Sequence, residues 1–176
     1  LIAWVQKAKI EARGITVAPI NLSELKKQLP TIRAMTTEDP SVFCPKLLEI
    51  LSNCGIALVF LPHIGGSFLH GATFYDKNKI VIGLTLRGKD ADKFWFSLFH
   101  EIGHILLGHL NQETELDNAA ESAADLFARD TLIPPKAFNS FVKQGAFSRS
   151  SIQTFSAAVG IDPGISVGRL QKEGYI

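Results

Sequence analysis

The sequence has few cysteines and no long apolar run. Among its 176 residues there are two cysteines, Cys44 and Cys54, and a single methionine, Met35. Two cysteines that are not spaced as C-x-x-C cannot form a disulfide framework or a four-thiolate zinc site. No apolar stretch approaches the roughly 20 residues that span a membrane, and no secretory signal is recognisable. These absences predict a globular protein of the reducing cytoplasm, without a membrane partner.

An excess of charge of one sign is also missing. The formal net charge is +1, which gives no global attraction to nucleic acid or to an anionic membrane surface. Apolar residues make up 46% of the chain, enough for one globular domain with a sizeable core. The first residue is Leu1 rather than methionine, so we expect this chain to be part of a longer protein.

Apolar periodicity and turn residues predict an α+β fold with a small, mostly antiparallel sheet. The continuous apolar run at 56–61, between Gly55 and Pro62, is typical of a strand buried on both faces. Turn-forming residues at 76–79 separate two further apolar segments and predict a hairpin. The expected strands are 56–61, 72–75 and 80–84. Helices are expected at 1–13, 40–54, 91–109 and 118–132. A further short helix, capped by Asn21 or Ser23, is expected to stop before Pro30.

The motif that carries chemistry is His100-Glu101-Ile102-Gly103-His104. Residues four apart share one face of a helix, so His100 and His104 can bind one metal ion. Glu101 lies about 100° around the helix, where it could act as a general base on water at that metal. The surrounding helix is apolar on almost every other side, so it is predicted to be buried. A metal ion would offset the cost of burying these polar groups.

A second helix supplies a candidate third ligand. Glu121 and Asp125 lie four residues apart on an alanine-rich helix that can pack closely against the first. We expect Glu121 to bind the metal and Asp125 to accept the free ring N–H of a histidine ligand. Two histidines, one glutamate and an open position are typical of a catalytic zinc site, although manganese would also fit. His109 lies off the ligand face and is predicted to be a loop residue.

Simpler interpretations of these residues remain open. His100 and His104 could be a buried pair held by neighbouring side chains, with no metal between them. Glu121 could instead stabilise its own helix, because a carboxylate near the N-terminus interacts favourably with the helix dipole. Asp125 could have a surface or capping role.

The segments 94–104, 121–128 and 132–134 resemble the ImmA/IrrE family of bacterial zinc metallopeptidases. The similarity extends to Gly71-Ala72-Thr73 and to 167–171. It implies a zincin-like fold whose sheet packs on the H-E-x-x-H and E-x-x-x-D helices, with the ligand set of a gluzincin. Carried over to this chain, the family pattern makes His100, His104 and Glu121 the zinc ligands, Glu101 the catalytic base and Asp125 the residue that supports a ligand. Many relatives have acidic residues where this chain has Ser122 and Ala123.

The function implied is zinc-dependent endopeptidase activity on a protein substrate. Family members cleave helix-turn-helix repressors, so the expected substrate is a transcriptional repressor or an antitoxin. The closest similarity is to the branch in which this domain follows an antitoxin-like helix-turn-helix domain. His70 and Tyr75, near a strand edge, are candidate oxyanion donors or substrate contacts. The alternative is a metallopeptidase-like module of such a regulator that binds protein or DNA without catalysis.

Residues 136–176 are expected to form a helical subdomain behind a metallopeptidase domain of residues 1–135. A helix to about Val159, a break at 160–164 and a second helix resemble a helix-turn-helix pair. The basic residues of this region form no dense patch, so direct nucleic-acid binding is not expected. The alternative is that the subdomain packs on the catalytic unit or recognises the protein substrate. The sequence does not predict the oligomeric state.

Overall fold

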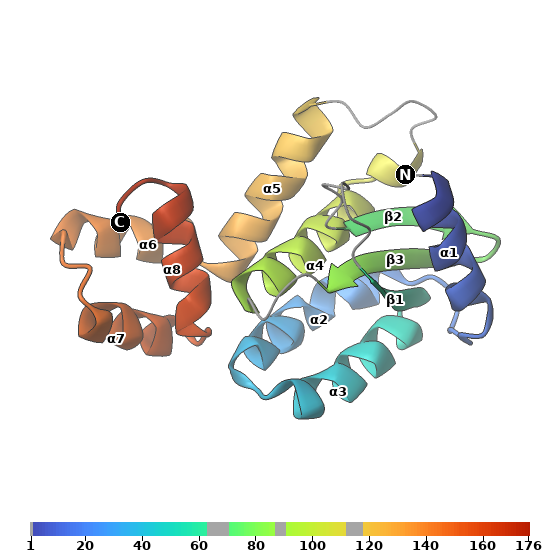
Figure 1. The fold of residues 1–176 in the computed structure, drawn as a ribbon, viewed down its shortest axis with the longest axis horizontal. Helices are drawn as coiled ribbons and strands as arrows, with labels where there is room; N and C mark the ends of the chain where they lie inside the picture. Colours follow the sequence, from blue (N-terminus) through green and yellow to red (C-terminus); the bar gives the residue numbers. More distant parts are fainter. Residues whose placement is uncertain (1, 63–70, 87–90, 112–117) are drawn as a thin grey trace.

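The computed structural model of the chain describes residues 2–62, 71–86, 91–111 and 118–176. Its fold is α+β, which confirms the predicted class, with a three-stranded sheet surrounded by helices (Figure 1). The helices are α1 (Ile2–Arg13), α2 (Leu22–Ala34), α3 (Pro40–Asn53), α4 (Ala91–Leu106), α5 (Asn118–Leu132), α6 (Pro135–Gln144), α7 (Arg149–Val159) and α8 (Pro163–Lys172), and short 3-10 turns lie at Met35–Thr37 and His109–Asn111. None of the helices in these ranges is long and apolar enough to cross a membrane.

The sheet is mixed, with the strand order β1-β3-β2. Its strands are β1 (Ile56–Pro62), β2 (Gly71–Asp76) and β3 (Lys79–Leu86). The predicted hairpin is present as the antiparallel pair of β2 and β3. The first strand, β1, runs parallel to β3, so the sheet is less antiparallel than expected. The hairpin places its second strand beside β1, which leaves β2 at the edge.

Helices cover both faces of β1 and β3. On one face, Trp4 of α1 packs with Val59 and Val81. On the other, Leu58 and Ile82 join the larger core that includes residues of α3 and α4. Successive strand residues point to opposite faces, so alternate residues enter the two cores. The prediction of a strand buried on both faces is therefore confirmed.

Two predicted helix ends are wrong. The helix α2 is capped by Asn21 as predicted, but it continues through Pro30 to Ala34. Leu25 and Ile32 are fully buried on either side of Pro30 and hold both halves of the helix on the core, while Pro30 itself is exposed. The helix α4 ends at Leu106 rather than near 109.

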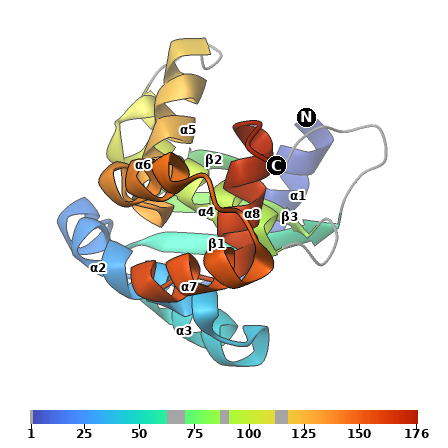
Figure 2. The same ribbon diagram turned by 90° about the vertical axis from the view of Figure 1, so that its left-hand side faces the viewer.

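The last three helices gather at one end of the molecule (Figures 1 and 2). The hydroxyl groups of Ser156 in α7 and Ser166 in α8 lie 2.7 Å apart and are buried. From α2, Arg33 donates hydrogen bonds to the carbonyl oxygens of Leu132 (2.8 Å) and Val159 (2.7 Å). These contacts pack the final helices on the rest of the chain, and the division at residue 135 stays a prediction.

Candidate metal centre

The centre forms where α4 and α5 approach each other closely. Gly103 of α4 is buried against α5, and a β-carbon built on it would lie 3.0 Å from Cδ1 of Phe127 and 3.3 Å from Cα of Ala124. Apart from Leu132 at its end, the buried residues of α5 are alanines, namely Ala120, Ala124 and Ala128. Small residues on both helices bring the first turn of α5, with Glu121, next to the motif of α4.

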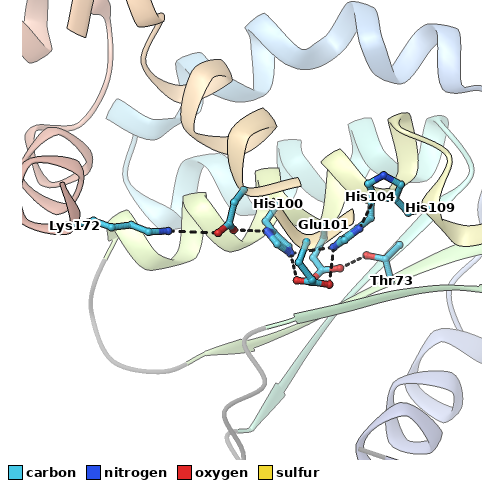
Figure 3. A network of polar contacts seen from close by, with 8 residues as sticks. Thr73, His100, Glu101, His104, His109 and Lys172 are labelled. Atoms are coloured by element: carbon cyan, nitrogen blue, oxygen red, sulfur yellow. Dashed lines mark hydrogen bonds and ion pairs between the residues drawn. The ribbon is translucent and has the colours of Figure 1, made fainter. Parts of the chain in front are cut away.

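The three predicted metal ligands converge on one point. The Nε2 atoms of His100 and His104 lie 3.0 Å apart, and the carboxylate oxygens of Glu121 lie 3.3 Å and 3.4 Å from them (Figure 3). Ligands bound to zinc at about 2.0–2.1 Å in a tetrahedron are separated by about 3.3 Å. The observed separations therefore fit a metal ion, and the Glu121 side chain is half exposed, which leaves the centre open to solvent on that side.

Asp125 supports His100 from behind. Its Oδ1 atom lies 2.8 Å from Nδ1 of His100. A carboxylate can only accept a hydrogen bond here, so Nδ1 of His100 carries the proton and Nε2 presents its lone pair toward the ligand cluster. Lys172 of α8 lies 3.6 Å from the other oxygen of Asp125, at the left of Figure 3. Asp125 thus lies where the sequence interpretation expected it, and its effect on metal binding stays a prediction.

His109, predicted to be a loop residue, makes a contact with the centre that the sequence did not predict. It lies in the 3-10 turn at His109–Asn111, and its Nδ1 atom is 2.9 Å from Nδ1 of His104. Gly108 has a left-handed backbone (φ 76°), which ends the helical path and turns His109 back toward α4. Helical spacing places His109 off the ligand face, so only the turn reveals this contact.

Burial sets the charge of His104. Its surface is 2% exposed, and this burial, followed by the proximity of His100 and His109, lowers the pKa of His104 to about 4. The ring is therefore neutral at pH 7, which is the form that binds a metal ion.

Glu101 is a buried carboxylate held by the edge strand. The hydroxyl of Thr73 in β2 donates a hydrogen bond of 2.5 Å to Oε2 of Glu101. Burial raises the pKa of Glu101 to about 7, against the opposing effects of the Thr73 hydrogen bond and His100. Gly71 passes so close that a β-carbon built on it would lie 2.6 Å from Oε1 of Glu101. The sequence interpretation gave Thr73 no role, although the segment Gly71-Ala72-Thr73 was part of the resemblance.

Of the two predicted substrate contacts, Tyr75 lies in the described part of the chain and His70 does not. Tyr75 is exposed in β2, two residues after Thr73, and strand alternation places it on the same face as Thr73. Its role stays a prediction. His70 lies outside the described residues.

The comparison with protein families identifies the chain. The model of peptidase family M78, described as the IrrE N-terminal-like domain, matches residues 67–156. The chain belongs to this family. The matched part of the chain includes β2, α4 and α5, and so contains every residue of the centre described above except Lys172. Among curated proteins, none matches the chain.

Family membership and geometry agree on the general chemistry. The IrrE N-terminal-like family is a peptidase family, and His100, His104 and Glu121 form a cluster that could hold a metal ion. With the proton of His100 on Nδ1 and His104 neutral, the cluster presents a carboxylate and imidazole nitrogens to a cation. This donor set fits a divalent metal.

Proposed function

We propose that the protein is a zinc-dependent endopeptidase that hydrolyses a peptide bond in a protein substrate. The observation that supports this most directly is the position of Glu101, buried and hydrogen-bonded to Thr73 on the helix that carries both histidines. A centre that only bound a metal would need the three ligands alone. A fixed carboxylate beside them adds the general base that peptide hydrolysis requires.

Two imidazoles and one carboxylate suit zinc well, and manganese is the second candidate. When bound, zinc would supply a Lewis acid that polarises a carbonyl group and lowers the pKa of water to about 7. The residues His100, His104 and Glu121 would hold it. The buried, apolar surroundings of α4 keep the two histidine side chains in place before the metal binds.

Glu101 carries out both proton transfers, and Thr73 and Asp125 hold the groups around it in position. Glu101 accepts a proton from the attacking water and passes it to the nitrogen of the leaving amine. The hydroxyl of Thr73 fixes Oε2 of Glu101, and we assign the transfer to the other oxygen, Oε1. Asp125 keeps His100 in the tautomer that presents Nε2.

The edge strand β2 supplies a surface for an extended peptide. Within the described part of the chain β2 pairs as a strand with β3 alone, and we propose that a substrate strand pairs with its second side. Thr73 in this strand contacts Glu101, so a peptide bound along β2 would pass beside the base. Tyr75, exposed on the same strand, is the candidate contact to the substrate or its oxyanion.

We propose a transcriptional repressor or an antitoxin of the helix-turn-helix type as the substrate, on the resemblance of the chain to the ImmA/IrrE family. The helix α8, which resembles a recognition helix, packs against α4 and directs the Arg169 side chain to the carbonyl oxygen of Ile133. This packing favours a protein partner over direct binding of nucleic acid by this part of the chain.

The test is a cleavage assay with candidate repressors encoded beside the gene. The protein is incubated with each candidate in zinc or manganese, and Glu101→Gln is run in parallel. We expect cleavage by the wild type and none by Glu101→Gln, while both bind metal equally. If both bind metal and leave every candidate intact, the protein is a metallopeptidase-like binding module instead. If Glu101→Gln cleaves as fast as the wild type, the role of the base is wrong.

A further inference from the structure

We infer that His109 is a positioning residue that fixes the ring of the metal ligand His104 through a hydrogen bond between their Nδ1 atoms. The inference rests on the proposed metal centre and adds to it a residue outside the H-E-x-x-H and E-x-x-x-D motifs. Figure 3 shows His109 behind His104, on the side of the ring away from His100.

The distance between the two rings determines their protonation. The Nδ1 atoms lie 2.9 Å apart, which is a hydrogen bond and requires one proton between them. The other nitrogen of His104, Nε2, lies 3.0 Å from Nε2 of His100 and 3.4 Å from Glu121. A nitrogen that binds a metal there carries no proton. In the metal-bound protein the proton is therefore on Nδ1 of His104, and His109 accepts it.

Both histidine ligands are thus supported from behind, but by different groups. His100 donates to the carboxylate of Asp125 at 2.8 Å, and His104 donates to the neutral ring of His109 at 2.9 Å. Partners of this kind fix the tautomer and orientation of a ligand and raise its basicity. A carboxylate is the stronger acceptor, so His100 is the more electron-rich ligand of the two.

Burial makes this partner hard to replace. His104 is 2% exposed, and Leu110, next to His109, packs against the main core and holds the turn in place. Water therefore has little access to Nδ1 of His104. Loss of the acceptor would leave a buried N–H without a partner or favour the tautomer in which Nε2 carries the proton, and this tautomer cannot bind the metal.

The experiment measures zinc affinity with a competing chelator in variants of the full chain. His109→Phe keeps a ring and removes the acceptor, and we expect it to bind zinc about 10–100-fold more weakly than the wild type. His109→Asn places an amide oxygen where Nδ1 was, and we expect it to restore most of the affinity. Leu107→Ala, two residues before His109 and exposed, is the matched control and should bind as the wild type does.

A second readout is the Nδ1–H group of His104 in the zinc-bound protein, measured by long-range ¹H–¹⁵N NMR. We expect a hydrogen-bonded Nδ1–H in the wild type and in His109→Asn, and loss of this hydrogen bond in His109→Phe. His109→Leu serves as a second variant without an acceptor if His109→Phe does not fold. If the wild type binds zinc and a folded variant without the acceptor binds it with the same affinity, the inference is overturned and the proposed function still stands. Failure of the wild type to bind zinc would overturn both.

Discussion

The hydroxyl of Thr73 donates a hydrogen bond of 2.5 Å to Oε2 of Glu101 and so joins the edge strand β2 to the motif helix α4. The base and the strand proposed to bind substrate are therefore held in fixed relation by two side chains. A change at either one alters how the peptide bond is presented to the carboxylate.

Replacing Thr73 by valine should lower activity. Thr73→Val keeps the shape of the side chain and removes the donor. Loss of a hydrogen bond to a charged group costs about 1.5–3 kcal/mol, which corresponds to a fall in kcat/KM of at least about tenfold if the base is misplaced. Thr73→Ser retains the hydroxyl and should keep most of the activity. Equal rates for the valine and serine variants would show that the hydrogen bond does not position the base.

A methyl group at position 71 should displace Glu101. In Gly71→Ala the new carbon would meet Oε1 at 2.6 Å, too close for contact, so the carboxylate must move. We expect kcat to fall on the order of tenfold, because small misplacements of reacting groups are costly. Zinc affinity should be unchanged, since the three ligands are not touched. Asn78→Ala, in the exposed hairpin turn, is the control and should leave both quantities as they are. Wild-type kcat in Gly71→Ala would contradict the placement of Glu101.

Removal of the metal should destabilise the protein. Zinc at 100 times its dissociation constant stabilises the folded state by about 2.7 kcal/mol, which corresponds to a rise in Tm of about 5–10 °C for a chain of this size. Treatment with a chelator should abolish this rise, and added zinc should restore it. In Glu121→Gln, which loses the carboxylate ligand, the zinc-dependent shift should be smaller. A Tm that does not respond to zinc in the wild type would argue against the centre.

Arg33 should hold the C-terminal helices in place. Arg33→Met removes the hydrogen bonds to the carbonyl oxygens of Leu132 and Val159, and we expect a loss of about 1.5–3 kcal/mol in the free energy of unfolding. Hydrogen exchange should increase at the end of α7. Lys27→Met changes a cation on the same helix whose side chain is 72% exposed, and it should change stability by less than about 0.5 kcal/mol. Equal stability of the two variants would contradict this role of Arg33.

Most of the candidate metal centre could be predicted from the spacing of residues within one helix. His100, Glu101 and His104 are placed relative to one another by helix geometry alone, so their arrangement follows from the motif. Glu121 required one more assumption, that small residues let α5 lie close to α4, and the contact at Gly103 bears this out. The resemblance to a family supplied the same set of residues independently.

Contacts between distant segments could not be predicted in this way. Thr73 reaches Glu101 only because β3 lies between β1 and β2, an order that local patterns do not determine. His109 reaches His104 through the turn at Gly108, which interrupts the periodicity on which the prediction relied. Similarly, the proline rule stopped α2 too early, because buried residues beyond Pro30 outweigh the lost hydrogen bond.

The contact between Gly103 and Ala124 has a consequence for chain entropy. The third ligand, Glu121, follows His104 on the next helix, so the chain between them closes a loop. Each doubling of such a loop adds only about 0.6 kcal/mol to its closure cost. The helix packing already holds the loop closed before a metal binds. We therefore expect a change in the length of the connection between α4 and α5 to cost little metal affinity, whereas a larger residue at Gly103 would force Phe127 or the backbone of α5 to shift.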